Sequence, residues 1–164
     1  MKTASPASLV VVHSYHNGNT LKIAKAMAQA LDARLTAPRD ADPHEVSAYG
    51  LVGFGSGIDS GDHYKPILDF ADQLPRADGR KAFIFSTCGI PVFAFGERYI
   101  EKYKAESHAA LRAKLVSKGY EIVGEFNCAG LNTNKFLKLF GGFNKGRPTA
   151  EDLEHARAFA WSLT

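Results

Sequence analysis

Polar side chains and one glycine gather between an apolar segment and an amphipathic segment near the start of the chain. Leu9 to Val12 form a β-branched apolar run typical of a strand buried on both faces. From residue 21 to 31 apolar residues recur at helical spacing. The residues between them that carry donor groups or a flexible backbone are Ser14, His16, Asn17, Gly18, Asn19 and Thr20. Such a loop points backbone N–H groups and the positive end of a helix dipole at one place, so we expect it to bind a phosphate.

Small and hydroxyl-bearing residues follow two further apolar segments. One group, Ser56, Gly57 and Ile58, comes where the strand expected at 49–56 gives way to a loop over 55–64. The other group is Ser86, Thr87, Cys88 and Gly89, where the strand expected at 81–86 gives way to a loop over 86–97. No nucleophile–base pair is evident, and no residue is expected to act as a general acid or base.

Strands and helices alternate along the whole chain, which predicts a parallel sheet covered on both faces. The expected strands are 9–12, 34–37, 49–56, 81–86 and 120–128. The expected helices are 21–31, 65–73, 98–118 and a final helix after Thr149, with a helical turn at 135–139. Thr149 is the predicted N-cap of the final helix, with Asp152 completing a capping box.

Five motifs carry a resemblance to a known family. The first loop contains S-x-H-x-G-N-T, and the later motifs are GFGSG (53–57), FSTCG (85–89), GEFNCAG (124–130) and GGFNKGRP (141–148). In order and spacing they resemble the flavodoxin-like family, in a branch whose phosphate loop carries a histidine. The resemblance implies an α/β doubly wound, five-stranded parallel sheet with strand order 2-1-3-4-5 in three α/β/α layers. The ligand of such a fold binds outside the carboxyl ends of strands 1 and 3.

The resemblance implies FMN as the cofactor, held by the three loops. The implied cofactor-binding residues are Ser14, His16, Asn17, Gly18, Asn19, Thr20, Ser56, Gly57, Ile58, Ser86, Thr87, Cys88 and Gly89. In the resemblance the first loop grips the phosphate, Ser86 and Thr87 lie beside the ribityl chain, and Cys88 and Gly89 lie at the polar edge of the ring. Ile58 and Tyr64 are candidates to pack on the ring.

Several of these residues also have ordinary structural interpretations. Thr20 can be a plain N-cap and Gly18 a plain turn residue. Tyr64 can be a helix packing residue, and Asp59, Asp62 and His63 can be turn and cap groups. The apolar residues 90–95 form either part of the core or a hydrophobic wall and docking surface beside the flavin.

Length and composition predict a single domain over residues 1–164. Hydrophobic residues make up 45% and charged residues 23%, with a formal net charge of +3, typical of a globular protein. No apolar run approaches a membrane span and the first residues lack a signal-peptide pattern, so we expect a cytoplasmic protein. No dense basic run indicates nucleic acid. The two cysteines, Cys88 and Cys128, have no metal-ligand spacing.

Three functions remain open from the sequence. The first is electron transfer through bound FMN to redox partner proteins, including acidic ones attracted by the basic segment 131–147. The second is a small FMN-dependent NAD(P)H oxidoreductase acting on quinones or similar acceptors. The third is a flavin-free interaction module. No acidic residue lies between Ser86 and Gly96, so we expect the reduced, anionic flavin to be less destabilised than in acidic electron carriers.

Overall fold

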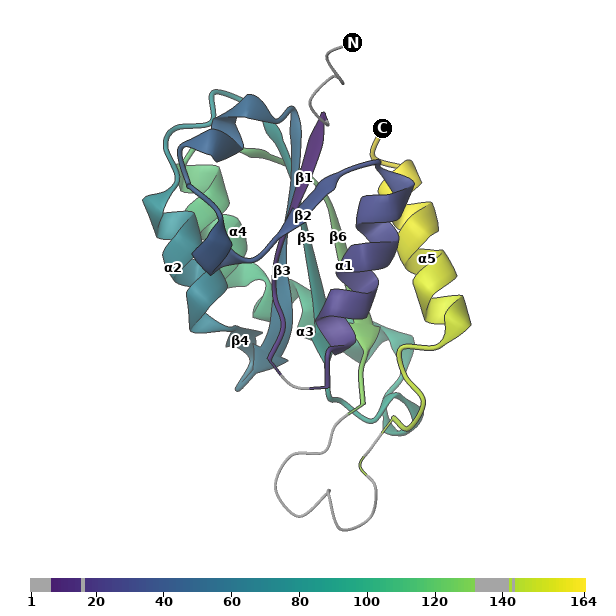
Figure 1. Cartoon of the computed structure of the whole chain (residues 1–164). Coiled ribbons are helices and arrows are strands. Elements are labelled where there is room, and N and C mark those ends of the chain that lie inside the picture. The colour runs from purple at the N-terminus through teal and green to yellow at the C-terminus, as the bar shows by residue number, and fades with distance from the viewer. Residues whose placement is uncertain (1–6, 16, 132–141, 143) are drawn as a thin grey trace.

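Five strands form one parallel sheet with helices on both faces (Figure 1). The computed structural model describes residues 7–15, 17–131, 142 and 144–164. The strands lie in the order β2-β1-β3-β5-β6, and a short strand, β4, pairs antiparallel with β3. Counted without β4, this is the predicted order 2-1-3-4-5, so the doubly wound three-layer fold is confirmed. The strands are β1 (Ser8–His13), β2 (Arg34–Thr36), β3 (Leu51–Asp59), β4 (Asp62–His63), β5 (Lys81–Cys88) and β6 (Glu121–Ala129).

The helices divide between the two faces of the sheet (Figure 1). On one face lie α1 (Asn19–Ala30) and α5 (Ala150–Trp161). On the other lie α2 (Lys65–Gln73), α3 (Glu97–Ser107) and α4 (Ala109–Ser117). Three short 3₁₀ turns complete the described elements: η1 (Pro38–Asp40), η2 (Glu45–Ala48) and η3 (Val92–Ala94).

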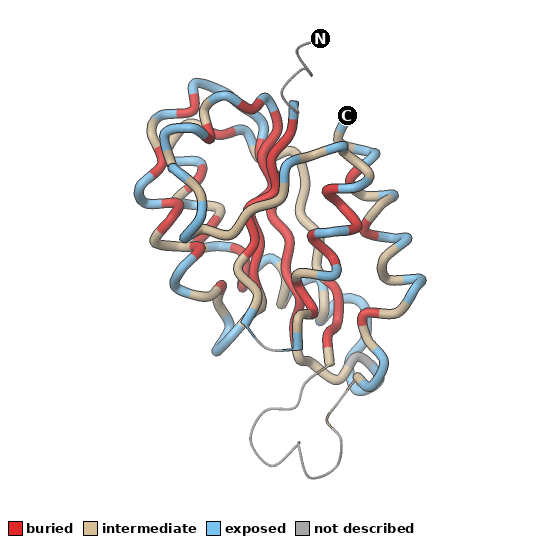
Figure 2. Tube along the Cα trace, in the orientation of Figure 1, coloured by how far each residue is buried: buried red, intermediate tan, exposed pale blue. Residues whose placement is uncertain are grey.

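The central strands are buried on both faces (Figure 2). In β1, Leu9 and Val11 pack into the core beneath α2 and α4, whereas Val10 and Val12 pack beneath α1 and α5. Period-two alternation places successive side chains on opposite faces, so a run that is apolar throughout is buried on both sides. The same alternation places neighbouring polar residues near the end of β5 on opposite faces of the sheet.

Close packing requires glycine at two positions of β3. A Cβ on Gly53 would lie 2.2 Å from the ring of Phe83, and a Cβ on Gly55 would lie 2.4 Å from the ring of Phe85. These rings from β5 lie across β3 and fill the volume that larger side chains would take.

Three predicted boundaries are wrong. The expected helix 98–118 is two helices, α3 and α4, which meet at His108. The segment 55–59, expected in a loop, is the end of β3, and β5 continues through Thr87 and Cys88. The predicted strand at 34–37 and the helix at 65–73 are confirmed, as is the capping box of Thr149 and Asp152. The turn expected at 135–139 lies outside the described residues.

Candidate functional site at the carboxyl edge of the sheet

The first loop leaves the start of α1 open. Gly18 occupies the N-cap position with φ of +65° and supplies no capping side chain, and one N–H of the first turn, that of Leu21, donates to Ser14 Oγ. The first turn of α1 carries no acidic residue, and the space where a Gly18 Cβ would project is empty to 4 Å among the described residues. A helix start whose N-cap is a glycine and whose approach is open fits an anion such as a phosphate.

Two asparagines tie the first loop to the segment that follows β6. The amide Nδ2 atoms of Asn17 and Asn19 both donate to the Leu131 carbonyl, at 3.2 and 2.9 Å. Asn19 is buried, and its Oδ1 has no hydrogen-bond partner among the described residues. Gly130 lies against Asn19, because a Cβ at residue 130 would be 2.5 Å from Nδ2. The loop therefore has one buried acceptor without a donor among the described residues. His16 lies outside the described residues.

The two hydroxyl groups of the first loop have different surroundings. The Ser14 Oγ accepts from the Leu21 backbone N–H at 3.4 Å. The Thr20 hydroxyl is buried and lies 2.7 Å from the Thr87 hydroxyl of β5. Thr20 lies inside α1 and is not its N-cap, so the plain capping interpretation is wrong for this residue. The structure thus brings together two predicted site residues that lie 67 positions apart in the sequence.

The second group of predicted residues lies in a strand and not in a loop. Gly57 and Ile58 belong to β3, and Ile58 pairs with His63 in the β3–β4 hairpin. The Tyr64 ring covers Gly57, since a Cβ there would be 3.0 Å from Cε2 of the ring. Tyr64 also lies edge-on to His13, with ring centroids 5.6 Å apart. Tyr64 immediately precedes α2 and contributes to the carboxyl edge beside the first loop.

The Ser56 side chain, by contrast, points away from this edge and contacts a buried histidine. Its Oγ lies 2.8 Å from Nδ1 of His63, and it accepts from the Tyr64 backbone N–H at 3.1 Å. His63 is 3% exposed, so it is not the surface turn group that the sequence suggested. Burial first, and then the charge of the nearby His108, lower the pKa of His63 to about 3. His63 is therefore neutral at ordinary pH.

The third group divides between the two faces of β5. Thr87 faces α1, as its bond to Thr20 shows. Ser86 is fully buried on the other face, where its Oγ lies 2.7 Å from Nε2 of His108 and accepts from Asn127 Nδ2 at 2.7 Å. Gly89 follows directly after the end of β5.

The surroundings of the Cys88 thiol make it unreactive. It lies 3.4 Å from Asn127 Oδ1, and burial raises its pKa. Burial likewise raises the pKa of the Cys128 thiol to about 12. Both cysteines are free and line a common cavity of about 200 Å³ beside the ends of β5 and β6. Neither thiol has the thiolate character of a nucleophile.

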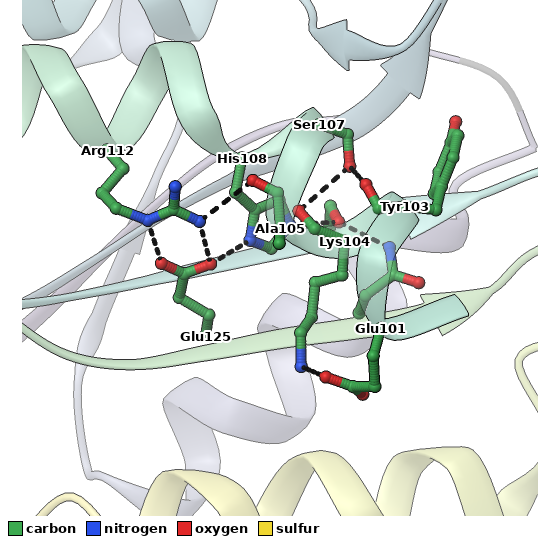
Figure 3. Close-up of polar contacts among 10 residues, drawn as sticks. Glu101, Tyr103, Lys104, Ala105, Ser107, His108, Arg112 and Glu125 are labelled. Atoms are coloured by element: carbon green, nitrogen blue, oxygen red, sulfur yellow. Dashed lines mark hydrogen bonds and ion pairs between the residues drawn. The ribbon is translucent and has the colours of Figure 1, made fainter. Parts of the chain in front are cut away.

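Sequence reasoning missed a charged cluster beside Ser86. His108 Nδ1 lies 3.0 Å from Glu125 Oε2, and Arg112 contacts both oxygens of the same carboxylate, at 2.5 and 2.8 Å. Figure 3 shows Arg112 and His108 directed at Glu125 from one side. Burial alone would raise the pKa of Glu125, but hydrogen bonds from Arg112 and His108 outweigh it and hold the pKa at about 2. The available signal was Glu125 itself, a charged residue in an otherwise apolar strand pattern.

The loop after β5 presents aromatic side chains to solvent. Phe93 is 81% exposed, and Phe95 and Tyr99 stack with ring centroids 4.4 Å apart while both remain exposed. The interpretation of 90–95 as core is therefore wrong for these phenylalanines. An exposed aromatic group beside the candidate site is typical of an interaction surface.

A larger cavity flanks the first loop on its other side. It has a volume of about 720 Å³ and lies at the ends of β1 and β2, with His13, Tyr15 and Arg39 in its wall. Burial and the charge of Arg39 lower the pKa of His13. The candidate site thus lies between this cavity and the aromatic loop.

No cluster of histidine, cysteine or acidic side chains suited to a metal ion occurs in the part of the chain that the structure describes. Among the described helices, none has the length and apolar character needed to cross a bilayer.

Comparison with known proteins identifies one sequence relative and many structural neighbours. No family model matches the chain. An uncharacterized protein of Methanocaldococcus jannaschii is 42% identical over 156 residues, which cover 95% of this chain and 97% of that protein. Flavodoxin 2 from Bacillus cereus superposes with a TM-score of 0.67 at 22% identity, covering 95% of this chain and 96% of the other. An NADH:FMN oxidoreductase superposes with a TM-score of 0.59 at 21% identity, covering 96% and 90%.

Proposed function

We propose that this chain, which belongs to one family with the uncharacterized protein of Methanocaldococcus jannaschii and has the fold of the flavodoxins, binds FMN and transfers electrons through it. The observation that carries this proposal is the open start of α1 at the switch point between β1 and β3. In doubly wound sheets a ligand binds at this position, where neighbouring loops diverge to opposite faces. A helix start with glycine at its N-cap there favours the phosphate of a mononucleotide.

The described residues fit such a cofactor. Gly18 allows close approach to the N–H groups of α1, and Ser14 supplies a hydroxyl beside them. The buried Asn19 Oδ1, which has no partner among the described residues, is an acceptor for a ribityl hydroxyl. Gly57, Cys88 and Gly89, near the ends of β3 and β5, would offer backbone groups and little steric bulk to a ring, and Ile58 would offer an apolar side chain. Ser56 and Ser86 would contribute their backbone only, because their side chains bond to histidines.

The flavin, when bound, supplies the redox chemistry, and the protein sets its position and electrostatic surroundings. From Ser86 to Gly96 the chain has no acidic residue, and the Cys88 thiol is held protonated by burial. This part of the site therefore places no negative charge beside a ring that becomes anionic. We expect a less negative potential than in electron carriers with acidic loops.

The aromatic loop is the proposed docking surface for a redox partner. Phe93, Phe95 and Tyr99 are exposed immediately after β5, which ends at the site. Exposed aromatic side chains supply contact area at low entropic cost. Lys145 is exposed and follows Asn144, whose side chain donates to the Ile90 carbonyl, so it favours an acidic partner here, whereas Arg147 is paired with Asp152.

A matched pair of variants at Gly18 tests the phosphate site. Gly18→Asp puts a negative charge at the helix start, whereas Gly18→Asn has nearly the same shape without the charge, and both tolerate positive φ. We expect FMN titration, followed by flavin fluorescence, to show affinity weakened on the order of 10- to 100-fold for Asp relative to Asn. Equal affinities of the two variants would contradict the placement of the phosphate. A well-folded wild type that binds no FMN would favour the flavin-free module.

A second candidate is an FMN-dependent NAD(P)H oxidoreductase. The cavity of about 720 Å³ beside the first loop, with Arg39 in its wall, favours it because a second substrate needs space next to the flavin. Steady-state oxidation of NADH or NADPH with a quinone by the purified holoprotein distinguishes it from an electron carrier, which turns over only with a protein partner.

A further inference from the structure

An unbroken series of hydrogen bonds runs from the candidate flavin site to the opposite side of the sheet. Cys88 Sγ lies 3.4 Å from Asn127 Oδ1, and Asn127 Nδ2 donates to Ser86 Oγ at 2.7 Å. Ser86 Oγ lies 2.7 Å from His108 Nε2, and His108 Nδ1 lies 3.0 Å from Glu125 Oε2. The series starts at the last residue of β5 and ends at a carboxylate on the α4 face.

His108 is the imidazole of this series, and an imidazole can hold a proton on one ring nitrogen or on both. It is fully buried, at the junction of α3 and α4, and both ring nitrogens have partners. With a neutral ring, Nδ1–H donates to Glu125 and Nε2 accepts from the Ser86 hydroxyl. With a protonated ring, Nε2–H donates to Ser86 Oγ. In both protonation states each ring nitrogen of His108 therefore keeps a hydrogen-bond partner, which a buried imidazole requires.

The charges that face His108 cancel one another. From β6 comes the Glu125 carboxylate and from α4 the Arg112 guanidinium, which form a two-point ion pair. From β4 comes His63, with ring centroids 5.0 Å apart, and it is neutral because its pKa is about 3. A neutral His108 thus completes a cluster without net charge, whereas a protonated His108 leaves one buried positive charge. A negative charge in the flavin site would offset it.

We propose that His108 takes up a proton when the neighbouring flavin site gains electrons, and so acts as a positioning and charge-compensating residue for the redox reaction. The proposal rests on the proposed FMN function. An external reductant delivers two electrons, one proton goes to the flavin, and one net negative charge remains there. A second proton comes from solvent and binds His108 Nε2, so that two electrons and two protons enter together.

The geometry gives the proton a route that avoids the flavin. The Glu125 side chain is 18% exposed and that of Arg112 is 33% exposed, so water reaches the far end of the cluster. The coupling is electrostatic, because the Asn127 amide does not carry a proton. For unit charges on the order of 10 Å apart at an effective dielectric constant of about 20, reduction increases the proton affinity of His108 roughly tenfold.

The test is the pH dependence of the two-electron midpoint potential of the FMN-loaded protein, measured with redox dyes. One proton per two electrons gives about 30 mV per pH unit, and two protons give about twice that slope. We expect the wild type to show the steeper slope over part of the range between pH 5 and 9. His108→Gln keeps a hydrogen bond to Ser86 without titrating and should show only the shallow slope. His44→Gln, which changes an exposed histidine at the amino end of the sheet, should match the wild type.

A second measurement needs no variant. Imidazole ¹⁵N–¹H spectra of the wild-type holoprotein give the titration of His108 in the oxidised and reduced forms. The proposal expects a pKa about one unit higher after reduction. An unchanged His108 titration, or equal slopes for wild type and His108→Gln, overturns it even if FMN binds tightly. A protein that binds no FMN overturns both this proposal and the proposed function.

Discussion

His63 makes the folded protein sensitive to mild acid. The imidazole is 3% exposed, its Nδ1 is bonded to Ser56, and its Nε2 has no partner among the described residues. Burial, reinforced by the nearby His108, lowers its pKa from 6.5 to about 3. A histidine whose pKa is depressed in the folded state contributes stability above pH 6.5, which is lost as pH falls toward 3, because the unfolded chain binds the proton first.

The magnitude at pH 5 follows from the unfolded pKa alone. At this pH the unfolded chain has nearly the full proton on residue 63 and the folded protein has nearly none. Protonation therefore stabilises the unfolded state by about 2 kcal/mol, which is 1.5 pH units at about 1.4 kcal/mol each. A folded pKa anywhere below about 4 gives the same result.

The perturbation is His63→Asn, which offers Ser56 an amide oxygen near the position of Nδ1 but does not titrate. The assay is urea unfolding at pH 7.5, 6.5, 5.5 and 5.0 for the wild type, His63→Asn and the exposed control His44→Asn. Going from pH 7.5 to 5.0, the wild type and the control should each lose about 2 kcal/mol more than His63→Asn. If all three proteins lose the same free energy over this range, the burial argument for His63 is refuted.

Two further predictions concern the stability of the sheet and of α5. Gly53→Ala places a Cβ 2.2 Å from the Phe83 ring, so we expect the unfolding free energy in urea to fall by about 1–3 kcal/mol; a neutral substitution would mean that the ring moves freely. Thr149→Ala removes the side chain that accepts from the Asp152 N–H at 3.1 Å, so we expect a loss of about 1 kcal/mol in thermal unfolding; Thr149→Ser should retain most of the cap, and a loss as large as that of alanine would contradict the capping role.

The sequence predicted a parallel sheet covered on both faces because each central strand carries an unambiguous signal, whereas the strand order came from the resemblance to the flavodoxin-like family. Val10 and Val12 on one face and Leu9 and Val11 on the other are all apolar, which only a strand covered on both sides requires. The loop after β1 was also predictable, since Gly18 and its polar neighbours stand between two strong elements.

The hairpin of β3 and β4 was missed because its turn is unusual. Ser60 and Gly61 have φ of +54° and +87°, the left-handed pair that joins two antiparallel strands with two residues. The first of these positions usually holds asparagine, aspartate or glycine, so a serine there weakens the hairpin signal. The segment therefore looked like an irregular loop, and His63 looked like part of it.

The histidine cluster could not be derived from the sequence because topology alone assembles it. Ser86, His108 and Glu125 lie on β5, between α3 and α4, and on β6, and no local spacing relates them. The break between α3 and α4 was hidden as well, since apolar residues continue at helical spacing on both sides of His108.

The end of β5 joins the two polar regions of the molecule. Thr87 bonds Thr20 on the α1 side, beside the proposed phosphate site, and the adjacent Ser86 bonds His108 on the α4 side. β5 pairs with β3 on one side and β6 on the other, so neither residue can shift without breaking ladder hydrogen bonds. The proposed flavin site lies at the carboxyl edge of the sheet, and His108 lies on the α4 side of β5. The strand thus holds the two at a fixed separation. Because β5 keeps that separation fixed, their electrostatic coupling needs no conformational change.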